Sequence, residues 1–186
     1  MSEQNGAEKN TAVPAWQIER LQTKDAARLQ RLAWQCYPPY YDYLWQPGAM
    51  EAYLTEAFDE TLLAAELADD NLVYEIVHAG GQDLAFLKWH RRADGEGCPD
   101  AAYLERVYVS PAGAGRRIGT ELIRRSVEGA RAEGRQWIWL RAMADLPQVL
   151  ARYEAAGFAT YARSAITTPG IRPERAGMVV MRCALT

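Results

Sequence analysis

The chain has 186 residues, of which 24% are charged and 49% hydrophobic, and its formal net charge at pH 7 is −3. These values describe an ordinary globular protein whose length suits one domain with a sizeable core. The slight acidic excess argues against nucleic acid as the main partner, because nucleic-acid-binding domains usually carry a basic excess. No apolar run approaches the ~20 residues that span a bilayer. Residues 1–10 lack the basic-then-apolar pattern of a secretion signal, so we expect a cytoplasmic protein.

The predicted elements alternate between short strands and amphipathic helices. Residues 1–14, which end at Pro14, are expected to form a disordered tail, and residues 15–186 to form one domain. Hydrophobic periodicity and turn residues predict strands at 16–21, 72–78, 84–91, 103–109, 137–143, 158–164 and 178–185. Helices are predicted from Thr23, around 50–58, at 61–68, from Ile118 to near Gly134, and from Pro147 to Gly157. Hairpins that flank a central strand–helix–strand unit predict a mixed sheet with one right-handed parallel crossover.

The central strand, residues 103–109, is apolar and rich in β-branched and aromatic side chains, as strands are. Successive side chains of a strand point to opposite faces. Strict alternation therefore places Val107 and Val109 on one face, and it places Leu104, Arg106 and Tyr108 on the other.

A turn rich in Gly and Arg joins this strand to the helix that begins at Ile118. The first turn of a helix offers free backbone N–H groups and the positive end of the helix dipole. Gly115 and Gly119 let a ligand approach the backbone, and Arg116 and Arg117 add positive charge. These are the requirements of a phosphate cradle, although a plain strand–turn–helix joint with surface arginines fits the residues equally well. The chain contains neither GxxxxGK[ST] nor GxGxxG, so the two common nucleotide-binding loops are not supported.

Cysteine and histidine give no sign of a metal site. Cys36, Cys98 and Cys183 are odd in number and widely separated, which implies neither a disulfide framework nor metal-ligand spacing. His78 and His90 lie singly in predicted strands, where a histidine is more often structural than catalytic. We therefore predict no metal.

An aromatic-rich segment lies before the predicted helix around 50–58. Its rings either pack a loop onto the core or line a binding pocket. The rings belong to Tyr37, Tyr40, Tyr41, Tyr43 and Trp45. Carboxylates follow on and between the next helices, where they form a solvated face or, if they border a cleft, favour a cationic substrate. They are Glu51, Glu56, Asp59, Glu60 and Glu66.

Three stretches, at 104–123, 138–158 and 181–185, resemble the GNAT superfamily of acyl-CoA-dependent N-acetyltransferases, and the similarity covers nearly everything after Pro14. The resemblance implies an α/β (α+β) fold: a mixed, mostly antiparallel sheet of six to seven strands, flanked by about four helices, with a central β-α-β unit for acyl-CoA. It also implies acetyl-CoA as co-substrate, no metal, and a primary amine as acceptor. A homodimer is common in that family.

The family cradle reads Gln/Arg-x-x-Gly-x-Gly/Ala, and this chain departs from it. Ala114 replaces the Gln or Arg, Arg117 replaces the first Gly, and Gly119 matches its position. Backbone N–H groups carry most of the binding, so these changes are compatible with a cradle if Arg117 keeps a helical conformation. Leu146 stands where the second motif usually has Asn, and Tyr153, Gly157 and Phe158 match.

By this resemblance the CoA diphosphate lies on residues 115–120, and the pantetheine arm runs between the splayed ends of the central strand and the strand at 137–143. Backbone groups of Val107 and Val109 would bind the arm like an added strand. The implied cofactor-binding residues are Val107, Tyr108, Val109, Gly115, Arg116, Arg117, Ile118, Gly119, Thr120 and Tyr153.

The implied chemistry is direct attack of a neutral amine on the thioester, through a tetrahedral oxyanion. Glu105, expected on the same face as Val107 and Val109, is the candidate base, with a cross-strand ion pair as its alternative role. Tyr153 is the candidate acid for the departing thiolate, with a core-anchoring role as its alternative. A backbone N–H near Val109 is expected to meet the oxyanion.

The acceptor is expected to be a small cationic amine. By the resemblance, the tyrosine-rich segment and the neighbouring helices form the acceptor-binding region. They are loosely similar to acetyltransferases of the polyamine type, a similarity on which the expected acceptor does not rest. Two alternatives remain open at the level of sequence. One is a CoA-binding regulatory domain that has lost catalysis, and the other is an acetyltransferase that acts on a protein or peptide amine.

Overall fold

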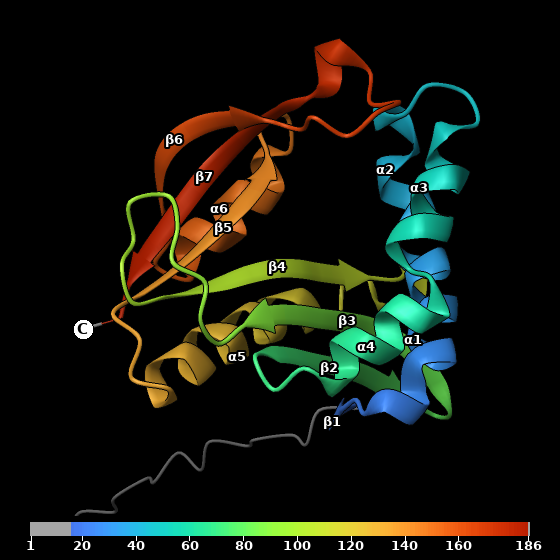
Figure 1. The fold of residues 1–186 in the computed structure, drawn as a ribbon, viewed down its shortest axis with the longest axis horizontal. Helices are drawn as coiled ribbons and strands as arrows, with labels where there is room; N and C mark the ends of the chain where they lie inside the picture. The colour runs from blue at the N-terminus through green and yellow to red at the C-terminus, as the bar shows by residue number, and fades with distance from the viewer. Residues whose placement is uncertain (1–15, 186) are drawn as a thin grey trace, which may run out of the picture.

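The computed structural model describes residues 16–185, which form one seven-stranded sheet in the order β1-β2-β3-β4-β5-β7-β6 (Figure 1). The tail predicted at 1–14 lies outside the described residues. The strands are β1 (Gln17–Arg20), β2 (Leu72–Ala79), β3 (Gln82–His90), β4 (Ala101–Val109), β5 (Trp137–Met143), β6 (Ala159–Ala165) and β7 (Gly177–Ala184). Each coincides with a predicted strand to within about three residues at either end.

The sheet is mixed and mostly antiparallel, which confirms the predicted fold class. β4 and β5 form its parallel pair, and the other five pairings are antiparallel. Parallel neighbours need a long crossover, and the helix α5 (Ile118–Ala132) provides it.

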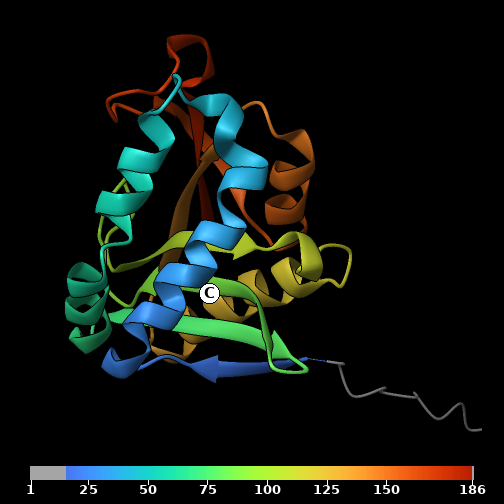
Figure 2. The same ribbon diagram turned by 90° about the vertical axis from the view of Figure 1, so that its right-hand side faces the viewer.

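Helices cover both faces of the sheet (Figures 1 and 2). One face carries α1 (Ala26–Cys36), α2 (Pro38–Tyr41), α3 (Ala49–Ala57) and α4 (Glu60–Ala68). The other face carries α5 and α6 (Pro147–Ala155). The first helix ends before Pro38 and Pro39, as predicted. Pro38 then occupies the first turn of α2, where its missing N–H is not needed for a helical hydrogen bond. Within residues 16–185, no helix is long and apolar enough to cross a membrane.

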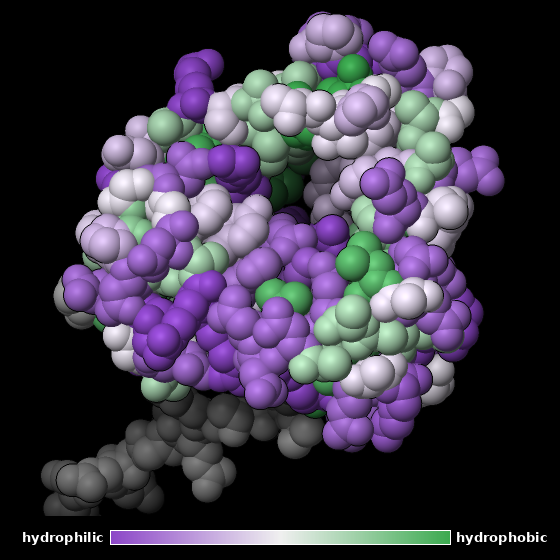
Figure 3. Space-filling model, in the orientation of Figure 1, coloured by the Kyte–Doolittle hydropathy of each residue, from purple (hydrophilic) through white to green (hydrophobic). Residues whose placement is uncertain are grey.

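The sheet opens where β4 and β5 diverge. The two strands pair only from Ala101 to Leu104 on β4, and both continue beyond the last pair, Leu104 with Leu140. The space-filling view shows a hollow between the two halves of the molecule at this place (Figure 3). The parallel pairing therefore ends in an opening that backbone groups of both strands border.

A β-bulge lies at the same point and corrects the predicted faces of β4. Trp89 of β3 pairs with Leu104 and Lys88 pairs with Arg106, so Glu105 is an extra residue opposite the β3 ladder. Leu104 consequently shares the α5 side with Val107 and Val109, and not the face of Arg106 as predicted.

The same bulge turns Glu105 toward the opposite face. Its carboxylate contacts Lys88 and His90 of β3, and Lys88 in turn contacts Glu66 of α4. The prediction that Glu105 shares a face with Val107 and Val109 is therefore wrong, because it assumed unbroken alternation.

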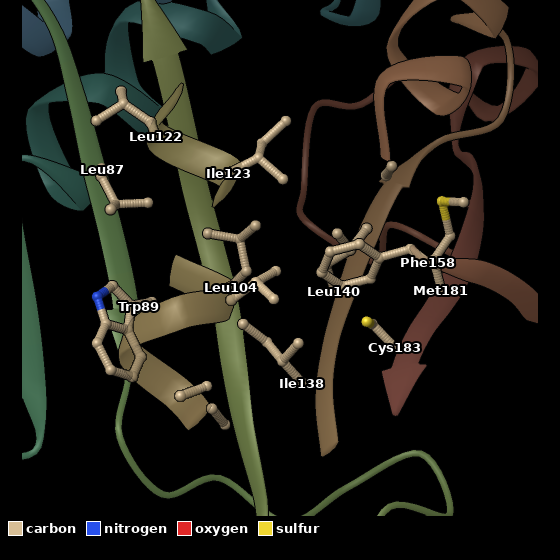
Figure 4. Packing of buried hydrophobic residues seen from close by; sticks show 14 of the residues in the cluster. Leu87, Trp89, Leu104, Leu122, Ile123, Ile138, Leu140, Phe158, Met181 and Cys183 are labelled. Atoms are coloured by element: carbon tan, nitrogen blue, oxygen red, sulfur yellow. The ribbon is translucent and has the colours of Figure 1, made fainter. Parts of the chain in front are cut away.

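The core on the α5 side is continuous across the opening (Figure 4). Leu122 and Ile123 of α5 pack with Leu104, and on the other half Leu140 lies near Phe158. Burying one such side chain fully contributes about 1.5–3 kcal/mol. The apolar contacts hold the two halves of the sheet together where backbone pairing is interrupted.

Candidate active site

Two adjoining cavities lie where β4 and β5 diverge. The first is bordered by the end of β4, the start of α5 and α6, and the second by residues of both strands. The first has a volume of about 490 Å³ and the second of about 360 Å³. Both are bordered by the same five residues, Tyr41, Val107, Leu146, Val149 and Tyr153. A molecule in either cavity therefore meets a molecule in the other beside Val107 and Tyr153.

The first cavity contains the predicted cradle. The backbone of the turn and the start of α5 border it from Gly113 to Thr120, apart from Arg116. Gly115 has φ +76°, a conformation that side chains disfavour. Gly113 is needed for another reason, since a Cβ there would lie 2.9 Å from the carbonyl oxygen of Leu84.

Arg117 caps the start of α5 in the left-handed conformation, with φ +59° and ψ +12°. The condition named for the cradle, a helical conformation of Arg117, is therefore not met. A non-glycine residue in this region costs on the order of 1–3 kcal/mol, which glycine avoids. Glycine, which the family pattern has at this position, would adopt the same conformation without that cost.

The predicted cofactor-binding residues fall into three groups. Most border the first cavity, namely Val107, Val109, Gly115, Arg117, Ile118, Gly119, Thr120 and Tyr153. Tyr108 instead borders the second cavity and packs against Phe86 with 5.3 Å between ring centroids. Arg116 borders neither cavity.

The backbone of β4 is oriented for pairing with a ligand in the gap. The N–H of Ser110 donates to the carbonyl oxygen of Leu84 on β3. Hydrogen-bonded residues alternate along an antiparallel ladder, so Val109 and Val107 direct their backbone groups away from β3. These groups are thus available at the edge that faces the opening.

Three residues of α6 border the first cavity without having been predicted: Gln148, Val149 and Arg152. Val149 lies four residues before Tyr153, which places the two side by side on the helix surface. Helical spacing from Tyr153 would have found Val149, whereas it gives no signal for Gln148 or Arg152.

Tyr153 stands at the junction of the two cavities and packs against Phe158, with ring centroids 5.9 Å apart. Burial raises the pKa of the Tyr153 phenol, and the neighbouring phenols of Tyr41 and Tyr103 raise it further. The hydroxyl therefore stays protonated near neutral pH and is able to donate a proton or a hydrogen bond.

Aromatic rings form one wall of the second cavity. Tyr37 stacks on Tyr41 at 4.7 Å between centroids, and Trp45 stacks on Tyr53 at 4.8 Å. The indole N–H of Trp45 donates to the Tyr37 hydroxyl over 3.3 Å. The predicted packing role is therefore present, since Tyr37 and Trp45 are buried in the core, and the same two rings border the second cavity. Of the remaining predicted rings, Tyr40 borders the first cavity. Tyr43 borders neither cavity, and its hydroxyl donates a hydrogen bond to the carboxylate of Asp145.

Glu105 borders the second cavity within a network of charges. Its carboxylate lies 2.9 Å from Lys88 Nζ and 2.6 Å from His90 Nε2. Burial raises the pKa of Glu105, but the hydrogen bond with His90 and the charges of Arg106 and Lys88 outweigh it and bring the pKa to about 2. The ion-pair role that the sequence left open is therefore present, and the carboxylate is ionised at neutral pH.

Solved structures share this fold. The N-acetyltransferase PaiA of Thermoplasma acidophilum, crystallised with coenzyme A, is 16% identical, with a TM-score of 0.72 over 91% of this chain and 98% of its own. A GCN5-related N-acetyltransferase of Rhodopseudomonas palustris is 21% identical, with a TM-score of 0.69 over 95% and 99%. YncA of Salmonella typhimurium, a putative acetyltransferase determined with acetyl-CoA, is 16% identical, with a TM-score of 0.63 over 92% and 95%.

Sequence comparison gives the family. No curated protein matches this chain at significant similarity. Residues 26–158, well over half of the chain, match the family model described as acetyltransferase (GNAT) family. This stretch contains the bulged strand, the cradle and Tyr153, and the protein therefore belongs to the GNAT family of acetyltransferases.

Proposed function

We propose that this enzyme transfers an acetyl group from acetyl-CoA to the primary amine of a small molecule, by direct attack on the thioester. The observation that carries the proposal is the position of Tyr153 at the junction of two cavities, one with a phosphate cradle and one with aromatic walls. Two reactants bound in adjoining cavities react as if within one molecule, which lowers the entropic part of the barrier.

The first cavity fits the anionic end of acetyl-CoA. Arg117 and Arg152 border it, and no carboxylate of the described residues does. The free N–H groups and dipole of the first turn of α5 favour a diphosphate beside Gly115 and Gly119. The edge of β4 at Val107 and Val109 would then pair with the amide groups of the pantetheine arm.

The second cavity would hold the acceptor. An amine reaches the thioester as an ammonium ion and has to lose a proton before it attacks. Glu105 is the proposed acceptor of that proton. Because its pKa is about 2, the carboxylate binds and orients the ammonium but holds a transferred proton only briefly, so water in the cleft is expected to carry it away.

Tyr153 is the proposed acid that protonates the departing thiolate. The raised pKa keeps its hydroxyl protonated at neutral pH, as this step requires. The oxyanion of the tetrahedral intermediate would be met by a backbone N–H near Val109, at the end of β4.

The test combines binding with turnover. A thermal-shift titration compares acetyl-CoA, CoA and ATP, and CoA release is then followed across amines that include spermidine, aminoglycosides, amino acids and short peptides. Stabilisation selective for CoA species, with release by one amine class, is the expected result. Stabilisation without release would instead favour a CoA-binding regulatory domain, and release by peptides alone would favour a macromolecular acceptor. No stabilisation by either CoA species would overturn the proposal.

A further inference from the structure

The acceptor cavity is not the acidic pocket that a polyamine would need. Among its described lining residues the charged side chains are one carboxylate, Glu105, and two guanidinium groups, Arg106 and Arg141. The carboxylates of α3 and α4 border neither cavity, and Glu66 is occupied by Lys88 and Tyr74.

Arg106 has binding capacity that the protein does not use. Its Nε lies 3.3 Å from Glu105 Oε1, and its guanidinium stacks 4.6 Å from the centroid of the Phe58 ring. Its Nη1 is buried and has no hydrogen-bond partner among residues 16–185. A buried charged donor without a partner is unfavourable, so an acceptor oxygen of a ligand would stabilise a guanidinium that turns toward the second cavity, which Arg106 borders.

The other cationic group of the cavity is already engaged. Arg141 forms an ion pair with Glu96 and lies over the Trp139 ring at 5.9 Å. Its side chain is 44% exposed, which weakens its attraction for a ligand because solvent screens it. Arg106 is therefore the stronger candidate for binding an anion.

The bulge places Glu105 and Arg106 side by side on the same wall, although they are consecutive residues of a strand. A carboxylate next to a guanidinium complements a ligand whose ammonium and carboxylate are close together. That arrangement is present in an amino acid, where one carbon separates the two groups. The aromatic wall formed by Tyr37, Trp45 and Tyr53 would pack against an apolar side chain.

We propose that the acceptor is a primary amine that also carries a carboxylate, of the amino-acid class, with its carboxylate on Arg106 and its amine beside Glu105. The inference rests on the proposed acetyl transfer and names its substrate class. The acceptor proposed here still has a primary amine, as expected from the sequence, but it is a zwitterion and not a polyamine.

The decisive comparison needs no mutation. CoA release is measured with an aromatic amino acid, with its carboxamide, and with the amine that lacks the carboxyl group, such as phenylalanine, phenylalaninamide and phenethylamine. Loss of one charge-assisted interaction lowers kcat/KM by roughly 10- to 100-fold. Phenylalanine or a homologous amino acid is therefore expected to exceed both analogues by about that factor.

Variants assign the preference to the guanidinium. Arg106→Gln is expected to remove the preference for the carboxylate while acetyl-CoA still stabilises the protein. Arg106→Lys keeps the charge without the planar fork, so it is expected to recover only part of the preference. Arg163→Gln, at an exposed position of β6, is the matched control and should keep the full preference. Circular dichroism and the thermal shift with acetyl-CoA show whether each variant is folded.

The outcomes separate the two proposals. Equal or better turnover of amides, decarboxylated amines or spermidine in the wild type would overturn the amino-acid acceptor and leave acetyl transfer intact. A preference for carboxylates that persists in Arg106→Gln would also overturn the assignment. Absence of both CoA stabilisation and CoA release would instead overturn acetyl transfer itself.

Discussion

The carboxylate of Glu105 lies 2.6 Å from Nε2 of His90, at the point where an extra residue interrupts the ladder between β3 and β4. The contact ties the bulge to its neighbouring strand through side chains where the regular backbone register shifts. Lys88, only 3% exposed, adds a positively charged partner. Stability at this point of the sheet consequently depends on the charge of one carboxylate.

Glu105→Gln is expected to destabilise the fold by about 3 kcal/mol at pH 7. The folded pKa of Glu105, about 2, lies below the ordinary value of 4.5, and each pKa unit corresponds to about 1.4 kcal/mol of stability. A lowered pKa stabilises the protein above pH 4.5, and this contribution is lost as the pH falls through about 2. Urea unfolding of wild type and variant between pH 7 and pH 2 should show the difference shrinking. Glu128→Gln, in an exposed ion pair of α5, should change stability by less than about 0.5 kcal/mol. A difference independent of pH would contradict the low pKa.

Tyr153→Phe should lower kcat by roughly tenfold or more, because the thiolate would leave without its proton donor. The Kd for acetyl-CoA should stay nearly unchanged, since the ring and its packing against Phe158 are retained. Single-turnover kinetics and calorimetry measure the two quantities. Tyr161→Phe, on a half-exposed tyrosine of β6, removes a hydroxyl away from the cavities and should have no effect. An unaltered kcat in Tyr153→Phe would remove this residue from the mechanism.

Gly129→Ala is expected to destabilise the protein even though alanine favours helices by about 1 kcal/mol. A Cβ at Gly129 of α5 would lie 2.7 Å from the Trp89 ring, so the ring or the helix has to shift. Overpacking of this kind typically costs about 1–3 kcal/mol. Chemical denaturation measures the change, and the substitution should cost less in a Trp89→Phe background, where the ring is smaller. A stabilising Gly129→Ala would show that the ring adapts freely.

Arg117→Gly should stabilise the chain by about 1 kcal/mol, because glycine relieves the left-handed backbone but adds freedom to the unfolded state. Arg116→Gly is the control, since Arg116 does not have a positive φ and gains nothing from glycine. Thermal unfolding without ligand compares the variants. If both substitutions lower the midpoint equally, the left-handed conformation of Arg117 is not strained.

The sequence predicted the elements closely where a periodic pattern determines them. The strand over 137–143 and the helix from Ile118 agree with β5 and α5, because their hydrophobic spacing reflects burial on one face. Glycines and prolines marked the turns between these elements, because the backbone freedom of glycine and the fixed φ of proline act within a few residues. Rules for hairpins and crossovers then predicted the mixed sheet with its central parallel crossover, but they did not predict that β7 lies between β5 and β6.

The details of the site were less predictable, because they depend on tertiary register. Nothing within residues 103–109 shows that Glu105 is an extra residue, since that becomes visible only when β4 is paired with β3. The left-handed Arg117 likewise follows from how the turn closes between strand and helix, and the residue type gives no hint of it. The unpartnered Nη1 of Arg106 requires the positions of all its neighbours.

Most strand positions have to pair with the neighbouring strand and also present a suitable side chain. At the bulge these two requirements are separate, because the extra residue is not part of the pairing. Removing Glu105 from the chain would leave Leu104, Arg106 and Val107 in strict alternation, with every neighbour on its present face. The ladder between β3 and β4 therefore does not need this residue. Exchanging the side chain at position 105 is therefore expected to change the charge that borders the second cavity and to cost the ion pairs with Lys88 and His90, without repacking either apolar layer of the core.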